Sequence, residues 1–132
     1  MFGFSKHEKL AKPIDSVMNA WAAVQALDAG LSGSAGAPIS GAAHAGFLWG
    51  VADSLGQARG FDLETTAKGL KHYLSRFSDG DEVFVLAATA PLNTDSAPWV
   101  DLAGKAVHAI STGKDPMQVL LPLAEKYRLG TV

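Results

Sequence analysis

The sequence predicts an all-α protein, built as one domain from an irregular or orthogonal bundle of five to six helices. Most apolar positions recur with the 3.6-residue period that places side chains on one face of a helix. Glycine, proline and helix-capping residues interrupt this period at intervals typical of helix ends. The 132 residues are enough for one hydrophobic core and too few for two, so we expect one domain over residues 1–132.

The first helix is predicted over residues 13–28. Pro13 suits the first turn of a helix, because its missing N–H has no helical partner there. Residues 1–12 precede this helix and are expected to be flexible, frayed or docked on the core. Their lysines and phenylalanines leave shallow contact with an anionic membrane surface as the alternative.

A loop is predicted over residues 30–41, where repeated glycine and one proline oppose any regular element. A phosphate-binding loop would also need a Lys-Ser/Thr pair and a preceding strand, and the sequence has neither here. The second helix is expected over residues 40–58, and Gly60 ends it.

The third helix has the clearest apolar pattern in the chain, and Asp62 is suited to cap its N-terminus. The residues expected on its buried face are Leu63, Ala67, Leu70, Tyr73, Leu74 and Phe77.

Residues 83–90 are apolar throughout, which fits a buried strand or a buried helix. Val83, Phe84 and Val85 favour a strand locally. A lone strand would leave its backbone donors and acceptors unpaired, however, and no second run offers a pairing partner. We therefore favour a helix for this segment.

The fifth helix is predicted over residues 99–111, and Gly113 ends it. Asp115 and Pro116 are suited to cap and begin a sixth helix. Pro122 is expected to kink this last helix near its middle.

The composition argues against several classes of protein. Eleven Lys and Arg against thirteen Asp and Glu give a formal net charge of −2, which disfavours nucleic acid as a partner. The absence of cysteine excludes disulfides and thiolate chemistry, and it is compatible with a reducing cytoplasm. The first residues lack the apolar block of a secretory signal, and no run is long and apolar enough to insert into a membrane. We expect a cytoplasmic protein.

No catalytic or metal-binding signature occurs in the sequence. It has neither a His-Glu-x-x-His zinc motif nor a Gly-x-Ser-x-Gly nucleophile turn, so we assign no metal, cofactor or catalytic residue. The balance leans against an enzyme, and an enzyme that uses a histidine stays as an alternative.

His44 is the candidate ligand-binding residue. Its helical phase places it on the apolar face of the second helix, whereas His72 and His108 align with charged residues. With Trp49 on the same helix, His44 predicts a pocket between helices that binds a small ligand. The competing interpretation is a buried histidine whose hydrogen bonds serve only the fold.

Gly46 and Gly50 are the candidate interface residues. With Ala42 they recur every four residues, so their small side chains allow another helix to approach closely. Trp49 lies between the two glycines and is a candidate interface anchor, because aromatic residues dominate interface hot spots. The competing interpretation is a close helix crossing inside the chain.

Four basic residues of the third helix lie opposite its apolar face: Lys68, Lys71, His72 and Arg76. This basic stripe suits an acidic partner, a phosphate-bearing ligand or RNA. The competing interpretation is a solvated helix face, because no aromatic residue lies in the stripe to stack on a base.

The function that these features favour is a protein-interaction module or homo-oligomer without catalytic chemistry, with an unknown protein partner or a second copy of the chain. The alternatives are a small-ligand-binding protein, with His44 and Trp49 lining the pocket, and an enzyme that uses a histidine.

Overall fold

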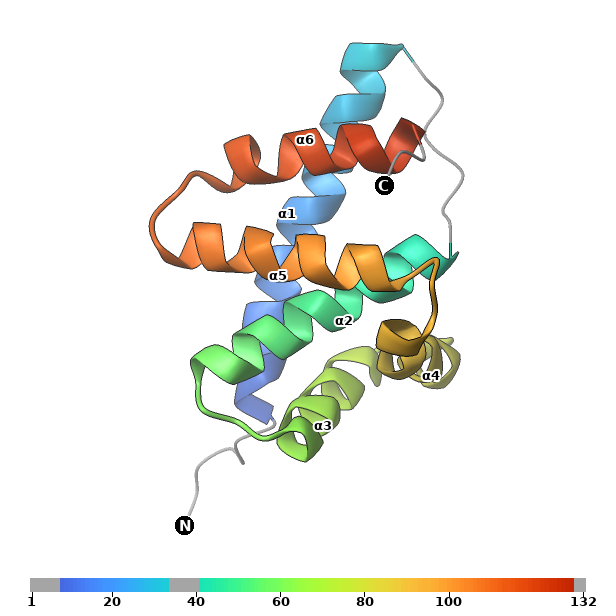
Figure 1. Ribbon diagram of the computed structural model, residues 1–132, viewed down its shortest axis with the longest axis vertical. Coiled ribbons are helices and arrows are strands. Elements are labelled where there is room, and N and C mark those ends of the chain that lie inside the picture. The colour runs from blue at the N-terminus through green and yellow to red at the C-terminus, as the bar shows by residue number, and fades with distance from the viewer. Residues whose placement is uncertain (1–7, 34–40, 130–132) are drawn as a thin grey trace.

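The computed structural model describes residues 8–33 and 41–129, and every regular element in these residues is a helix. The all-α prediction is therefore confirmed. The elements in chain order are α1 (Glu8–Ser32), α2 (Gly41–Ala58), α3 (Leu63–Leu74), α4 (Gly80–Thr89), the 3-10 helix η1 (Ala90–Leu92), α5 (Ala97–Ser111) and α6 (Pro116–Leu129) (Figure 1).

The helices cross at steep angles and form the irregular bundle that the sequence predicts. The long helix α1 runs along the molecule, and the antiparallel pair α5 and α6 crosses in front of it (Figure 1). Helix α2 packs against α5 along much of its length, and α3 packs against α1. Helices α3 and α4 lie together at the end away from α6.

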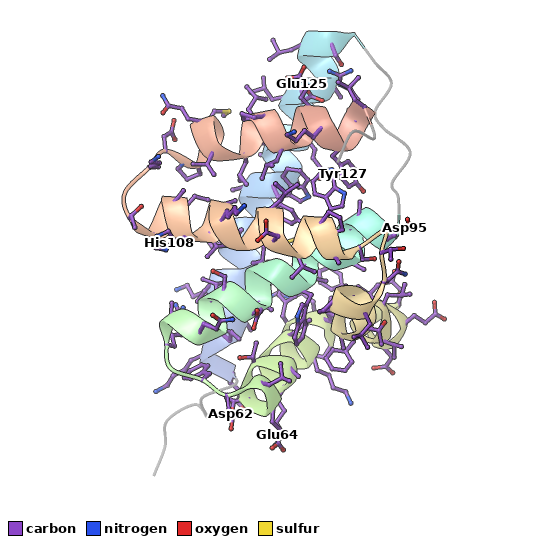
Figure 2. All side chains as sticks on the ribbon, in the orientation of Figure 1. Asp62, Glu64, Asp95, His108, Glu125 and Tyr127 are labelled. Atoms are coloured by element: carbon purple, nitrogen blue, oxygen red, sulfur yellow. The ribbon has the colours of Figure 1, made fainter. Side chains whose placement is uncertain are left out.

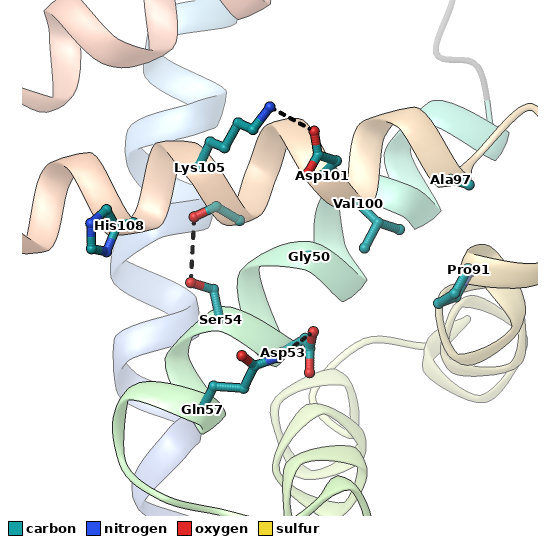
Figure 3. A pocket seen from close by; sticks show the side chains of 11 residues that line it. Gly50, Asp53, Ser54, Gln57, Pro91, Ala97, Val100, Asp101, Lys105 and His108 are labelled. Atoms are coloured by element: carbon teal, nitrogen blue, oxygen red, sulfur yellow. Dashed lines mark hydrogen bonds and ion pairs between the residues drawn. The ribbon is translucent and has the colours of Figure 1, made fainter.

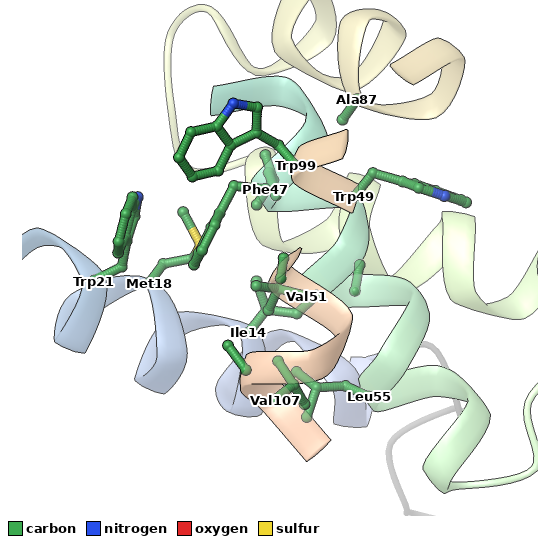
Figure 4. Packing of buried hydrophobic residues seen from close by; sticks show 14 of the residues in the cluster. Ile14, Met18, Trp21, Phe47, Trp49, Val51, Leu55, Ala87, Trp99 and Val107 are labelled. Carbon is green, nitrogen blue, oxygen red and sulfur yellow. The ribbon is translucent and has the colours of Figure 1, made fainter. Parts of the chain in front are cut away.

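An aromatic cluster joins four helices in the core. The rings of Trp21 from α1 and Phe47 from α2 are stacked, with centroids 4.2 Å apart. Tyr127 of α6 (Figure 2) places its ring edge-to-face with Trp21 at 5.8 Å and with Trp99 of α5 at 5.4 Å. Figure 4 shows Trp21, Phe47 and Trp99 gathered on one side of the core, with Trp49 apart from them. These contacts fix α6 against the rest of the bundle.

Helix α1 is longer than predicted at both ends. It includes Glu8 to Lys12, because Leu10 is fully buried one turn before Ile14 and extends the buried stripe. Pro13 is therefore inside the helix and not in its first turn. The helix also continues past Asp28 to Ser32 and ends at Gly33, whose positive φ of 71° suits a glycine helix stop. Of the predicted loop, residues 34–40 lie outside the described residues, as do residues 1–7 of the predicted flexible terminus.

Helix α3 has the predicted cap. The Asp62 side chain accepts a hydrogen bond from the Thr65 backbone N–H at 2.7 Å. Leu70 at the centre of the stripe is fully buried, but Leu63 at its start is 67% exposed and Phe77, beyond its end, is 44% exposed. The predicted burial of these two residues is wrong, because they extend past the helices that cover the centre of α3.

Residues 80–89 form helix α4, so the preference for a helix is confirmed. The helix is not buried all round, however. Only Gly80 and Ala87 are buried within it, and Val85 and Leu86 are 59% and 55% exposed. Helix α4 packs on α2 and α3 with one face, which leaves these two side chains outside.

Helices α5 and α6 lie close to their predicted bounds. Gly113 follows α5 with a positive φ of 102°, as expected for a glycine after a helix. Helix α6 begins at Pro116 and runs as one helix through Pro122 to Leu129. Near its end, Arg128 donates from Nε to Asp28 of α1 at 2.8 Å, in a largely buried ion pair.

Candidate functional site

The candidate site is a partly enclosed cavity of about 220 Å³ beside His44. Helices α1, α2, α3 and α4 and the turn between α3 and α4 all contribute to its wall. The lining residues are Met18, His44, Leu48, Tyr73, Leu74, Phe77, Asp79 and Val83. The cavity wall is therefore mainly apolar, with an imidazole and a carboxylate as its ionisable groups besides the Tyr73 phenol.

The turn between α3 and α4 folds closely and brings Phe77 and Asp79 to the cavity. The Phe77 N–H donates to the Leu74 carbonyl at 3.0 Å, and the Gly80 N–H donates to the Phe77 carbonyl at 3.1 Å. A side chain at Gly80 would overlap the Leu74 carbonyl oxygen, so glycine is what allows this tight packing. The turn thus follows the end of α3 and closes one side of the space next to α2.

His44 is half-buried, and its surroundings change the pKa of its imidazole. Burial lowers the pKa of its imidazole from the ordinary value, and the nearby Asp79 carboxylate opposes this change. At pH 7 the ring is therefore mainly neutral and offers one N–H donor and one lone pair. Within the described part of the chain, neither ring nitrogen forms a hydrogen bond. The imidazole is thus a neutral group with unused donor and acceptor capacity at the cavity wall.

Tyr73 lies on the α3 side of the cavity. Burial raises the pKa of its phenol above the ordinary value, Asp15 raises it further, and Arg76 opposes both. The Arg76 guanidinium lies 5.1 Å from the Tyr73 ring centroid and 5.9 Å from that of Phe77. A cation therefore already packs on the two aromatic rings of this wall.

Trp49 does not line the cavity, which corrects its predicted place beside His44. Trp49 is only 6% exposed and belongs to the hydrophobic core. It also offers no surface for a partner in this fold, so its predicted role as an interface anchor loses its basis. The reason is the helical phase, which separates residues five apart by about 140° around the axis.

Gly46 and Gly50 lie where α2 crosses α5 of the same chain. An added Cβ at Gly46 would overlap the Ser96 carbonyl oxygen, and one at Gly50 would overlap the Val100 carbonyl oxygen. Both glycines are buried, so the fold itself covers the surface that was predicted to meet a partner. The structure therefore shows the competing interpretation, a close helix crossing inside the chain.

The basic stripe on α3 is partly neutralised by its neighbours. Lys68 pairs with Glu64 at 3.3 Å, and Arg76 pairs with Asp15 of α1 at 3.0 Å. The Lys71 ammonium lies 5.8 Å from the ring centroid of Phe84 on α4. His72 is exposed on the same helix face. Contacts within the fold thus engage Lys68, Lys71 and Arg76.

A second, more open groove of about 580 Å³ lies between α2 and α5, with Pro91 of η1 at one end (Figure 3). It brings Asp53, Ser54 and Gln57 of α2 opposite Asp101, Lys105 and His108 of α5.

Most of the groove's polar groups are paired with one another. Gln57 donates to Asp53 at 2.9 Å, Lys105 pairs with Asp101 at 2.9 Å, and the Ser54 hydroxyl donates to the Gly104 carbonyl at 3.4 Å (Figure 3). The donors of Gln57, Lys105 and Ser54 are therefore already engaged within the groove.

Sequence reasoning missed the groove and the place of Asp79. Gly104 was a signal for the groove, because its missing side chain leaves open space on α5. Asp79 had no such signal, since a Ser-Asp-Gly-Asp segment predicts only a break between helices. Its position depends on how the turn folds over α2.

The described residues contain no group of three or more His, Cys, Asp or Glu side chains arranged to hold a metal ion. In the same residues, no helix combines the length and the apolar character needed to cross a membrane. Comparison with protein-family models, curated proteins and solved structures finds no match to this chain.

Proposed function

We propose that the protein binds a small, mainly apolar molecule in the cavity beside His44. The observation that supports this proposal most strongly is the convergence of four helices on a cavity whose wall holds an imidazole with unused hydrogen-bonding capacity. Ligand sites are typically apolar cavities with a few polar groups that orient the ligand. The ring nitrogens of His44 are not among the buried polar atoms that lack a partner, so water can reach them and a ligand would take the place of that water.

The size of the cavity limits the ligand to about one ring with a short substituent. An apolar cavity of about 150 Å³ binds benzene, and this one has about 220 Å³. The proposed function is binding and not catalysis. We assign no catalytic role to the residues that line the cavity.

The binding proposal is tested by a pair of variants on one helix. Val83 lines the cavity, whereas Val85, two residues later on another face of α4, is 59% exposed and does not line it. We expect Val83→Phe to fill the cavity and abolish binding, and Val85→Phe to bind as the wild type does. Binding is measured by ligand-detected NMR with small monocyclic amines, alcohols and carboxylates. Far-UV circular dichroism and thermal unfolding show whether both variants fold.

Two results would refute the binding proposal. One is the failure of every probe to bind the wild-type protein at millimolar concentration. The other is undiminished binding to a folded Val83→Phe variant, which would place the site elsewhere, for example in the groove between α2 and α5.

Self-association is a second candidate function. The surface that supports it is not the one around Gly46 and Gly50 that the sequence predicted. The α4–η1 surface consists of Val85, Leu86 and Leu92, of which Leu92 is 88% exposed. A second copy of the chain would cover these apolar side chains in a homodimer. A stable interface needs about 800 Å² from each partner. Three side chains supply only part of that area, so we expect a weak dimer that forms at tens of micromolar.

Light scattering at tens of micromolar tests this second candidate. Leu86→Glu should restore the monomer mass, and Leu63→Glu on the distant start of α3 is the matched exposed control. A monomeric wild-type mass would refute the homodimer. We propose the cytoplasm as the compartment for either function, on the sequence grounds given above.

A further inference from the structure

We infer that the cavity beside His44 selects a primary amine on a small apolar body, with Asp79 as the residue that binds the ammonium group. This inference rests on the proposed binding function and names the chemical class of its ligand. It is carried by the unused acceptor groups of Asp79 and His44 at one cavity and by the charges around them.

The Asp79 carboxylate does not cap helix α4, although its position suggests that role. It occupies the N-cap position of α4, where aspartate normally accepts a hydrogen bond from a backbone N–H of the first turn. Asp62 does this at the start of α3, but the Asp79 side chain makes no capping hydrogen bond. Within the described residues it also forms no ion pair. Asp79 is exposed, so its carboxylate is an acceptor without a protein partner that faces both the cavity and the solvent.

His44 and Asp79, which lack a hydrogen-bond partner at the cavity, together favour a ligand rich in donors. The neutral His44 ring offers one lone pair, and the Asp79 carboxylate offers acceptors only. An ammonium group carries three N–H donors, so it can serve both residues at once. A ligand carboxylate would meet like charge at Asp79, and a hydroxyl would bring a single donor.

The surrounding charges favour a cation as well. Asp81 and Glu82 follow in the first turn of α4, and neither forms an ion pair with a described residue. The Arg76 guanidinium, which packs on Tyr73 and Phe77, is already paired with Asp15. The N-terminal end of α4 contributes a positive partial charge of about one half, which offsets only part of these three carboxylates.

The aromatic wall adds a further attraction for a cation. Phe77 and Tyr73 both line the cavity, and the face of an aromatic ring attracts a positive charge. The Arg76 guanidinium already packs on these two rings, so a ligand cation would contact the ring faces that Arg76 leaves open. The apolar residues Met18, Leu48 and Leu74 are left to contact the body of the ligand.

Three probes of one size separate these contributions: benzylamine, benzyl alcohol and benzoate. We expect benzylamine to bind wild-type protein about tenfold or more tightly than benzyl alcohol, because charge-assisted hydrogen bonds are roughly twice as strong as neutral ones. Benzoate should bind most weakly. Asp79→Asn should weaken benzylamine to the affinity of benzyl alcohol and leave benzyl alcohol within about twofold.

Asp81→Asn is the matched control, because it removes the same charge two residues away from a side chain that does not line the cavity. It should weaken benzylamine by less than about threefold. Asp79→Asn removes no capping hydrogen bond, so its thermal unfolding should stay close to that of the wild type.

The outcomes distinguish the ligand class from the site itself. Equal binding of benzylamine and benzyl alcohol, or an unchanged amine preference in Asp79→Asn, would overturn the amine inference and leave the binding site standing. Tightest binding of benzoate would overturn it in the same way. Failure of all three probes to bind the wild-type protein would overturn both the inference and the proposed function.

Discussion

Replacing Gly46 with alanine tests whether α2 and α5 cross as closely as the structure shows. A Cβ at position 46 would overlap the Ser96 carbonyl oxygen and lie 2.9 Å from the Cβ of Trp99. Neither obstacle is the flexible end of a long side chain, so neither can rotate away. Helix α5 itself would have to move, and the buried ring of Trp99 would move with it.

Two opposing effects set the size of the change in stability. Alanine favours a helix interior over glycine by about 0.5–1 kcal/mol. Adding a methyl group to a packed core typically costs about 1–3 kcal/mol, and the upper part of that range applies where backbone atoms must shift. We therefore expect Gly46→Ala to lower the free energy of unfolding by about 1–2 kcal/mol.

The assay is urea denaturation followed by circular dichroism, with Gly104→Ala as the matched control. Gly104 lies inside α5, and an added Cβ there meets no atom within 4 Å. This control should be neutral or more stable by up to about 1 kcal/mol, since only helix propensity changes. If Gly46→Ala is as stable as Gly104→Ala, the close crossing and the steric reasoning built on it are wrong.

Leu70→Ala should destabilise the fold by about 2–5 kcal/mol in chemical denaturation, because Leu70 is 0% exposed; a loss below about 1 kcal/mol would contradict its packing. Arg128→Ala should cost roughly 1–3 kcal/mol, because it leaves the buried Asp28 carboxylate without its partner; restored stability in the double variant with Asp28→Asn would support this cause, and an additive loss would contradict it. Because burial lowers the pKa of His44 below about 6.5 while the nearby Asp79 carboxylate opposes the change, the unfolded chain binds more protons there as pH falls. Stability should therefore decrease from about pH 7 toward the folded-state pKa, and His44→Gln should reduce this decrease; equal pH profiles would contradict the lowered pKa.

Periodicity and cap chemistry predict most of the fold, because both depend on neighbours in the sequence. Asp62 and Gly113 mark helix ends that the structure confirms. The same reasoning fails at the outer ends of helices. Leu63 has the phase of a buried residue, but it lies beyond the elements that cover α3. Which part of a helix is covered depends on packing between helices, and that information is not local.

Helix α4 shows a similar limit. The absence of a pairing partner correctly indicates a helix for residues 83–90, since a lone strand would leave backbone groups unpaired. An apolar composition then suggests burial on every side. Val85 and Leu86 are instead exposed, because α4 is short and contacts the bundle with one face.

The two candidate residues on α2 separate for a reason that the sequence already contains. His44 has the phase of Leu48, and both line the cavity. Trp49 is about 140° away around the same helix, so one cavity beside α2 is not expected to contact both residues. Helical phase was therefore a better guide than proximity in sequence. The second polar group of the cavity could not be found this way, because Asp79 belongs to a turn.

Asp62 and Asp79 occupy the same position before a helix, but only Asp62 caps its helix. Both residues precede a helix and are suited to cap it, and their local sequences give no reason to expect a difference. Asp62 caps α3, whereas Asp79 leaves α4 without a side-chain cap and lines a cavity that also holds the unpartnered imidazole of His44. The missing side-chain cap costs helix α4 some stability, whereas the ring nitrogens of His44 remain open to water. An aspartate that does not cap its helix, placed beside a histidine at one cavity, is the pattern expected where a fold gives up a local interaction for binding.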